Sequence, residues 1–359
     1  MEACILIGRP LMSAADIDHP GSNSRVSLFG CNQAKKRGTM AAVIVLALFL
    51  MGAMVAPLCA QTYPSKPVRF ILPFPAGGLT DVLGRIMGQK FADRLGQPIV
   101  PENRPGAGGN LGIEIAAKAR PDGYTIVLSA PALAISPHLY KQLNYDPVKD
   151  LAPISLVAEI SNVLCVRSSL PVKSLGELVA FAKANPGKLN YGSGGTGSSL
   201  QIAAEMFKSL AKVSIVHVPY KGVTQAMMGM IGSEVDMVVI GIPTSMQHIQ
   251  AGKVRALAVL NERRLPELPD VPTAKEAGID HFETSTWYGL LAPGGTPRDI
   301  INRLNAEWLK IVAMPDTRDK MQKVGFEPLS STPEQFAEFI KKETVRYGKV
   351  IKEANLSIE

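Results

Sequence analysis

The sequence predicts an α/β fold of two similar lobes, each a mostly parallel sheet flanked by helices, with a cleft between the lobes. Short apolar runs alternate along the chain with longer segments whose apolar residues recur at helical spacing. This alternation is typical of parallel strands that helices cover on both faces. Glycine-rich turns at 76–78 and 192–197 each join a strand to a helix, and their wide separation favours one turn per lobe.

The first lobe is expected to open with an apolar strand at 68–72. Leu83, Met87 and Phe91 follow at helical spacing, and Gly96 ends that helix. The same reasoning predicts strands at 98–102, 124–129 and 154–158 and a second helix at 108–119.

The second lobe is expected to continue the alternation. Ser174 and Glu177 have the spacing of a capping box, which predicts a helix start before 178–184. Strands are predicted at 163–167, 189–191, 215–219, 236–240 and 254–260, and helices at 199–210, 223–231 and 245–251.

The C-terminal part is predicted to be mainly helical. Thr332, Pro333 and Gln335 suit the N-cap, first and third positions of a final helix. The predicted elements here are a strand at 287–291 and helices at 298–312, 318–324 and 333–354.

These elements predict how the chain is divided. We expect the first lobe to combine 61–160 with 261–359 and the second lobe to be 161–260. The chain has no glycine- and serine-rich or charged linker between them. Ordered strand crossovers are therefore expected to join the lobes.

The first 60 residues resemble an export signal. Three basic residues at 35–37 precede an apolar run at 41–55, and small Ala60 suits a cleavage point. The alternatives are a membrane anchor, for which the run is short of the usual ~20 residues, and a lipoprotein signal ending at Cys59. Residues 1–34 are long for such a signal, so a later start codon is plausible.

Composition limits the possible partners and cross-links. The formal net charge is +7, but the basic residues are scattered and few aromatic residues lie among them. This argues against a nucleic-acid surface, whereas a mild positive field would attract anionic ligands. Of the four cysteines only Cys165 follows residue 60, so no disulfide is expected within the exported part.

The first glycine turn has the features of an anion site. A strand that leads through Gly77 and Gly78 into a helix presents backbone N–H groups to one point. Thr80 offers a hydroxyl, and Asp81 suits the positive end of the helix. The alternative is an ordinary strand–helix connection.

The second glycine turn matches the G-x-G-x-x-G pattern of dinucleotide sites. That fingerprint requires an acidic residue about 20 positions later, where this chain has none, and the lysine of a P-loop is also absent. The same N–H groups suit a carboxylate, and Ser193, Thr196 and Ser198 add hydroxyl donors.

Other segments carry weaker signals. The glycine turn at 106–112 is more typical of structure than of ligand binding. Lys221 could pair with an anion or be a solvated loop residue, and Trp287 and Tyr288 could line a cleft or fill the core.

The sequence shows no catalytic signature. No G-x-S-x-G, H-E-x-x-H or C-x-x-C motif is present, and the four histidines after residue 60 are widely separated and lack ligand spacing: His138, His217, His248 and His281. We therefore predict no metal, no cofactor and no enzymatic activity.

Seven segments in order resemble the Bug family, the TctC-type substrate-binding proteins of tripartite tricarboxylate transporters. They cover almost the whole exported part and are YPSKPVR (63–69), PFPAGG (73–78), ENRPGAGGN (102–110), PDGYT (121–125), LNYGSGGTG (189–197), VPYKG (218–222) and GGTP (294–297). The resemblance implies a two-lobed periplasmic-binding-protein fold, type II-like, that closes on a ligand.

The resemblance also implies which residues bind. A carboxylate would be held by the first strand–helix turn of each lobe, partly through backbone N–H groups and water. Many family members have a small polar residue where this chain has Leu79, so the resemblance implies no hydroxyl contact at this position in this chain. The implied ligand-binding residues are Phe74, Ala76, Gly77, Gly78, Thr80 and Asp81 in the first lobe and Ser193, Gly195, Thr196 and Ser198 in the second, with Asp236 as a weaker candidate.

The implied function is capture of a small carboxylate in the periplasm by a monomer that docks on a membrane permease. An extracytoplasmic sensor with the same fold is the alternative, and an enzyme is the third possibility. The ligand is left open among di- and tricarboxylates, acidic amino acids, aromatic acids and uncharged amides.

Overall fold

The computed structural model describes residues 63–353 and 356, which belong to one compact unit, Gln61–Glu359. The predicted export signal, its cleavage point and Cys59 lie outside the described residues. Within the described ranges, no helix is long and apolar enough to cross a membrane.

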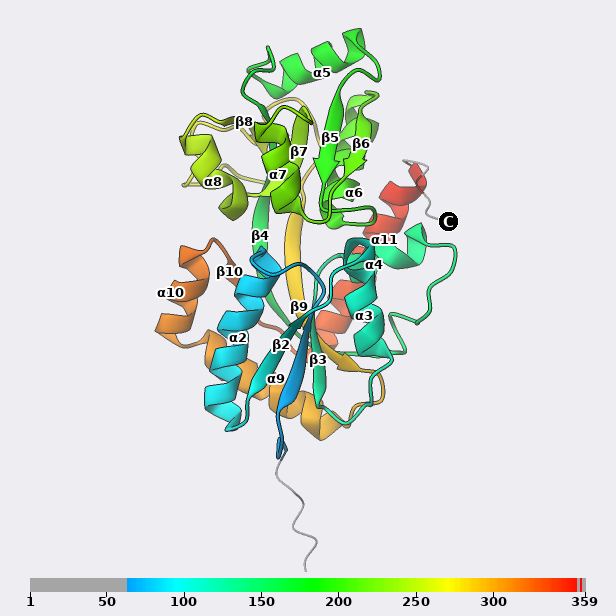
Figure 1. Cartoon of the computed structure of the whole chain (residues 1–359), viewed down its shortest axis with the longest axis vertical. Helices are drawn as coiled ribbons and strands as arrows, with labels where there is room; N and C mark the ends of the chain where they lie inside the picture. The colour runs from blue at the N-terminus through cyan, green and yellow to red at the C-terminus, as the bar shows by residue number, and fades with distance from the viewer. Residues whose placement is uncertain (1–62, 354–355, 357–359) are drawn as a thin grey trace, which may run out of the picture. The chain divides into compact units, whose positions relative to one another are not determined.

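The described residues form a mixed sheet with helices on both faces (Figure 1). The strands are β1 Val68–Leu72, β2 Ile99–Asn103, β3 Thr125–Ser129, β4 Leu151–Arg167, β5 Asn190–Ser193, β6 Val216–Pro219, β7 Met237–Gly241, β8 Val254–Val259, β9 Ser285–Pro293 and β10 Glu327–Pro328. The helices are α2 Leu79–Leu95, the 3₁₀ turn η1 Ala107–Gly109, α3 Asn110–Ala117, α4 Ala132–Leu139, α5 Leu175–Ala184, α6 Ser199–Ala211, α7 Val223–Ile231, α8 Ile242–Gln250, α9 Arg298–Val312, α10 Pro315–Lys323 and α11 Pro333–Glu353.

Each lobe has its own parallel strands. In the first lobe β1 lies between β2 and β3, with Phe70 opposite Pro101 and Ile126. In the second lobe β5 lies between β6 and β7 and is parallel to both. The predicted parallel pairing is present in both lobes. Antiparallel strands β4 and β9 join the two sets, and β8 and β10 each pair antiparallel with β4.

Alternation along the strands builds a core on each face of the sheet. In β1, Phe70 packs with α2 and α9, whereas its neighbour Ile71 packs with α3, α4 and α11. In β4, Leu164 faces the core with α5 and α6, and Cys165 faces the core with α7 and α8. Side chains two positions apart share a face, so one strand supplies two cores.

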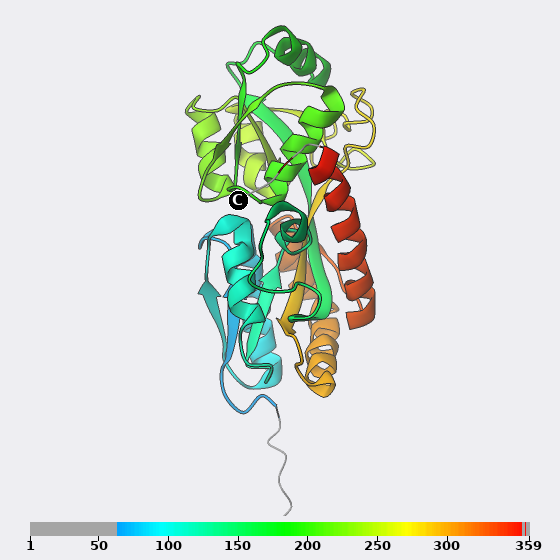
Figure 2. The same ribbon diagram turned by 90° about the vertical axis from the view of Figure 1, so that its right-hand side faces the viewer.

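A long strand and a helix connect the lobes. β4 pairs with β9 in the first lobe through Leu151–Ser161 and with β7 in the second lobe through Asn162–Val166. Figure 2 shows α11 running beside these strands toward the second lobe. We call Glu159–Asn162 of β4 and Thr284–Trp287 at the start of β9 the hinge segments. The prediction of ordered strand crossovers is confirmed at β4.

Several predicted elements need correction. The strands expected at 154–158 and 163–167 are one strand, because polar Glu159, Ser161 and Asn162 interrupt the apolar pattern at the hinge without ending the β4 ladder. The helix expected at 108–119 begins only at Asn110, since Gly108 and Gly109 have positive φ.

Two helices begin earlier than expected, and two elements were not predicted. Proline occupies the first turn of both α8 and α10, where its missing N–H is harmless, so those helices start at Ile242 and Pro315. The missed elements are α4, which contains Pro137, and the two-residue strand β10. Both predicted caps are confirmed: Glu177 donates its N–H to Ser174 Oγ, and Gln335 does so to Thr332 Oγ1.

Residues just after 260, the predicted end of the second lobe, still pack in the second lobe's core. Ala274, Ile279 and Phe282 pack in the second lobe's core, although 261–359 is expected in the first lobe. We propose that the chain returns to the first lobe at the start of β9, and the predicted limits at 160 and 260 stay a prediction.

Candidate functional site

A cavity of about 350 Å³ lies between the two lobes. The first lobe supplies the turn from Phe74 to Thr80, and β9 adds Thr286 and Tyr288. The second lobe supplies a larger set: Gly194, Ser198, Ser199, Leu200, Gly222, Val223, Thr224, Gln225, Gly241 and Thr244. Among the residues that the structure describes, none of those that line this cavity carries a charged side chain.

Four helices begin at the cavity. Their N-cap residues, Gly78, Ser198, Gly222 and Gly241, all belong to its lining. Only Ser198 among them makes a side-chain cap, by accepting the Gln201 N–H. The first N–H groups of a helix have no partner inside the helix, and the helix dipole adds partial positive charge there. This arrangement favours an anion without a basic side chain.

Parallel strands explain the convergence of these helix starts. Strands β1, β5 and β7 each end at the cavity and lead into α2, α6 and α8. The carboxyl ends of parallel strands share one edge of a sheet, which is where ligands bind in open α/β folds.

Six of the predicted site residues line the cavity: Phe74, Ala76, Gly77, Gly78, Thr80 and Ser198. The first turn has the geometry expected of it, because Gly77 has φ +78° and the extended Gly78 starts the helix. Phe74 packs against Gly109, where an added Cβ would lie 2.9 Å from the phenylalanine ring.

Asp81 is behind the cavity wall and supports the first turn. Its carboxylate accepts the Gly77 N–H at 3.0 Å and pairs with Arg85 at 3.0 Å. Burial alone would raise the pKa of Asp81, but hydrogen bonds from Arg85, Gly77 and Asn103 lower it overall. The carboxylate therefore stays charged and fixes the turn.

Ser193 supports the second turn in a similar way. Its buried hydroxyl lies 2.7 Å from His217 Nε2 and accepts the Gly195 N–H at 3.2 Å. Because Gln201 Oε1 accepts the Gly197 N–H, the amide nitrogen of Gln201 is the group that faces His217 Nδ1. Nδ1 therefore accepts, and Nε2 carries the proton that is donated to Ser193.

The environment of His217 keeps it neutral. Burial lowers its pKa, Glu205 opposes this, and Lys208 adds to the lowering. The ring also stacks on Tyr191, with centroids 4.8 Å apart.

The predicted site residues Ser193 and Gly195 do not line the cavity.

Thr196 and Asp236 lie elsewhere. Thr196 is exposed, and its carbonyl faces Gly108 of the first lobe. Asp236 precedes β7 and accepts from Arg167 Nε at 2.7 Å and from the Asn190 N–H at 2.9 Å. The start of a parallel strand lies at the end of the sheet away from the helix starts, so Asp236 is remote from the cavity.

The lobes touch at both glycine turns. A Cβ added to Gly108 would lie 2.7 Å from the Thr196 carbonyl oxygen and 2.8 Å from the Ser198 nitrogen. A Cβ on Gly222 would lie 3.6 Å from Pro75 Cγ. The turn at 106–112, expected to be structural, thus forms part of the contact between lobes.

The sequence analysis did not single out the starts of α7 and α8. Gly222 follows β6 closely and Gly241 ends β7, and each is the N-cap of the next helix. A glycine between a strand and a helix was therefore a usable signal.

The residues with weaker sequence signals differ in position. Tyr288 lines the cavity, whereas Trp287 donates a hydrogen bond to Glu343. Lys221 is exposed and outside the lining.

Tyr288 contributes a neutral phenol to the cavity. Burial raises its pKa, and a hydrogen bond with Thr80 opposes that only in part. Among residues 63–353 and 356, no group of histidine, cysteine and acidic side chains could hold a metal ion.

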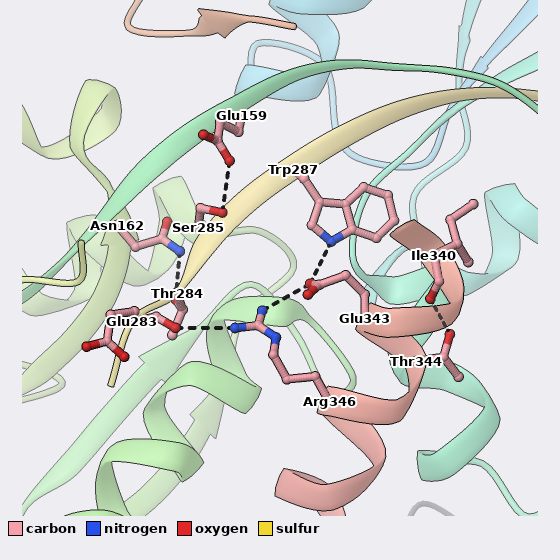
Figure 3. Close-up of polar contacts among 10 residues, drawn as sticks. All are labelled: Glu159, Asn162, Glu283, Thr284, Ser285, Trp287, Ile340, Glu343, Thr344 and Arg346. Atoms are coloured by element: carbon pink, nitrogen blue, oxygen red, sulfur yellow. Dashed lines mark hydrogen bonds and ion pairs between the residues drawn. The ribbon is translucent and has the colours of Figure 1, made fainter. Parts of the chain in front are cut away.

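The hinge segments are cross-linked by polar side chains (Figure 3). Asn162 donates to Thr284 Oγ1 at 3.0 Å, and Ser285 donates to Glu159 at 3.2 Å. From α11, Arg346 donates to Glu343 at 3.0 Å and to the Glu283 carbonyl at 3.3 Å. Through the Glu283 carbonyl and through Trp287, which donates to Glu343 at 3.1 Å, α11 is bonded to the start of β9.

The fold and cavity are those of a two-lobed periplasmic solute-binding protein. The sequence model described as "Tripartite tricarboxylate transporter family receptor" (TctC) matches residues 83–356. The chain therefore belongs to the TctC family, whose members are periplasmic solute-binding proteins and not enzymes. The resemblance seen in the sequence is confirmed.

Individual relatives agree over most of the chain. Protein BugT of Bordetella pertussis is 35% identical over 318 residues, which is 88% of this chain and 98% of BugT. A Rhodopseudomonas palustris protein solved with adipate is 32% identical and covers 82% of this chain and all of its own, with a TM-score of 0.78. MatC of the same species, solved with malate, is 33% identical, covers 80% of this chain and all of its own, and has a TM-score of 0.73.

Proposed function

We propose that this protein captures a small carboxylate in the cavity between its lobes and delivers it to a membrane permease of the tripartite tricarboxylate type. The observation that carries the proposal is the convergence of four helix starts on a cavity without charged side chains. The bound adipate and malate of two structural relatives support a carboxylate as the ligand.

The proposed site comprises the first turn and, in the second lobe, the starts of α6 and α7. The N–H groups after Gly78 and Gly222 would bind carboxylate oxygens, and Thr80 and Tyr288 would add hydroxyl donors. Asp81 and Ser193 would position the turns rather than touch the ligand. A ligand that contacts both lobes favours their closed arrangement by its differential affinity for that state.

Location and transport partner rest on the family. The export signal expected at 1–60 would place the protein in the periplasm, where a permease can receive the ligand. If the receiving partner is a signalling protein instead, the same capture would serve sensing.

The test is thermal unfolding of the protein against a library of carboxylates near neutral pH. A ligand at 100 times its Kd should add about 2.7 kcal/mol to the free energy of unfolding. We expect one structural class of acids to raise the midpoint by a few degrees. Absence of any shift, with no ligand retained from expression by mass spectrometry, would contradict carboxylate capture.

The variant Gly78→Val locates the site. The backbone of Gly78 is extended, and an added Cβ would meet only the Pro75 carbonyl at 3.4 Å, so the fold should tolerate it. The new side chain should abolish binding by occupying the helix start. Gly176→Val is the matched control, because a Cβ there meets nothing nearer than Ser174 Oγ at 4.0 Å. Equal affinity in both variants would reject the site.

A further inference from the structure

The cavity has an apolar wall beside the hinge. Leu79, the first residue of α2, and Ile160, in the β4 hinge segment, both line the cavity. A Cβ placed on Gly241 would lie 2.5 Å from Ile160 Cδ1 and 3.5 Å from Leu79 Cδ1. The two side chains therefore fill the space in front of the α8 N-cap.

This wall covers one of the four helix starts. Without the two side chains, the N–H groups of Ile242 and Thr244 at the start of α8 would be open to a ligand oxygen, whereas Pro243 has none. With them in place, a ligand meets hydrocarbon at this end of the cavity, and the start of α2 keeps its own N–H groups beside Gly78.

The hydroxyl on the strand opposite Ile160 is already engaged within the protein. Thr286 is the cross-strand partner of Ile160, and its hydroxyl donates to Asn162 Oδ1 at 3.2 Å. On the α8 side, the Ser245 hydroxyl donates to the Ile242 carbonyl at 3.1 Å. These two hydroxyls stabilise the hinge and α8, so neither of them is a free donor to a ligand at the wall.

We propose that Leu79 and Ile160 make the cavity selective for carboxylic acids whose hydrocarbon part carries no hydroxyl group. The proposal rests on the proposed function, because it describes the same cavity. A ligand hydroxyl placed against the wall would lose its water without gaining a partner, which weakens binding. An unsubstituted hydrocarbon part would gain from leaving water.

The test uses matched pairs of acids that differ in hydroxylation. Calorimetric titration of the purified protein would compare succinate with malate, adipate with galactarate, and cyclohexanecarboxylate with quinate. In the pair that binds most tightly, we expect the unsubstituted acid to bind at least about tenfold more tightly, as expected for one unpaired polar group.

Substitutions connect the preference to the wall. Leu79→Thr should reduce the ratio of affinities within that pair at least about threefold, since its hydroxyl gives the ligand a partner at this position. Leu79→Met should keep the preference, because its side chain is still apolar. Leu210→Thr, at the exposed end of α6 and outside the cavity, is the control for general effects.

The outcomes separate the two proposals. Equal or tighter binding of the hydroxylated acid by the wild-type protein, or an unchanged ratio in Leu79→Thr, would overturn the selectivity and leave carboxylate capture standing. If none of the six acids binds, both the selectivity and the capture of such acids are rejected.

Discussion

Asp81 shows how a charged residue can serve an anion site without touching the anion. Its carboxylate holds the Gly77 N–H and is itself neutralised by Arg85. The sequence places Asp81 in the first turn of a helix, a position that suits either ligand contact or support. Its exclusion from the cavity lining makes support the proposed role.

The lowered pKa of Asp81 predicts how its contribution depends on pH. A lowered folded-state pKa stabilises the fold above about pH 4, the pKa of unfolded aspartate, and this stabilisation is lost as the pH falls through the folded-state pKa. Asp81→Asn should therefore reduce the free energy of unfolding by about 1–2 kcal/mol at neutral pH. The difference from wild type should shrink in acid.

Denaturant unfolding at several pH values measures this effect. Asp93→Asn is the matched control, because Asp93 is exposed on the same helix and accepts a hydrogen bond from the Gln89 side chain rather than from an arginine and a backbone N–H. A loss of stability in Asp81→Asn that is the same at pH 7 and pH 3 would contradict the assigned ion pair.

At the scale of elements, the helix starts at the cavity and the glycine turns between the lobes determine what the molecule can do. Strand and helix periodicity predicts most of these elements within a few residues, because each apolar face must be buried. The pattern fails at Glu159–Asn162, where a strand must stay ordered while passing between two cores. It also cannot show that Gly222 and Gly241 reach the same cavity as Gly78, since that depends on strand order.

The turn at Gly108 gives a prediction about lobe contact. Gly108→Ala would place a Cβ against the backbone of Thr196 and Ser198, so the lobes could not approach as closely. We expect ligand affinity to fall at least about tenfold, which corresponds to about 1.4 kcal/mol. Small-angle scattering with ligand should show a larger radius of gyration than for wild type.

Gly252→Ala is the control for backbone strain. Gly252 has φ +67°, close to the +63° of Gly108, and nothing lies within 4 Å of an added Cβ. Both variants should lose about 1–2 kcal/mol of stability from the left-handed conformation, but only Gly108→Ala should bind weakly. Similar affinities in the two variants would show that Gly108 does not limit closure.

At the scale of the whole molecule, two lobes are connected by β4, by the start of β9 and by α11, whose core also includes Ile202 of α6. The motifs in the sequence identify the family and therefore this architecture. They do not identify the hinge, because its bonds join residues as distant in sequence as Asn162 and Thr284. They also do not exclude Asp236, whose position depends on which end of the sheet faces the cavity, or Lys221, which lies at the cavity end but is exposed and outside the lining.

The variant Arg346→Ala tests whether the contact between α11 and the chain beside the hinge segments favours lobe closure. In Arg346→Ala, the Glu283 carbonyl would lose its hydrogen bond to α11, the last helix. Glu283 follows Phe282, which packs in the second lobe's core. We expect a shift toward separated lobes and ligand affinity lower by about two- to tenfold, as for loss of one hydrogen bond.

The comparison variant is Lys349→Ala. Lys349 lies on the same helix, and its side chain is 79% exposed. Its ion pair with Glu353 is long, at 4.0 Å, so Lys349→Ala should change neither affinity nor scattering. If Arg346→Ala behaves like Lys349→Ala in both measurements, the contact has no role in closure.

The most direct test of the central claim is a crystal structure with the acid that stabilises the protein most. We predict that its carboxylate oxygens accept from backbone N–H groups at the starts of α2 and α7, with no lysine or arginine within hydrogen-bonding distance. A carboxylate held by a basic side chain, or bound outside the cavity between the lobes, would contradict the account.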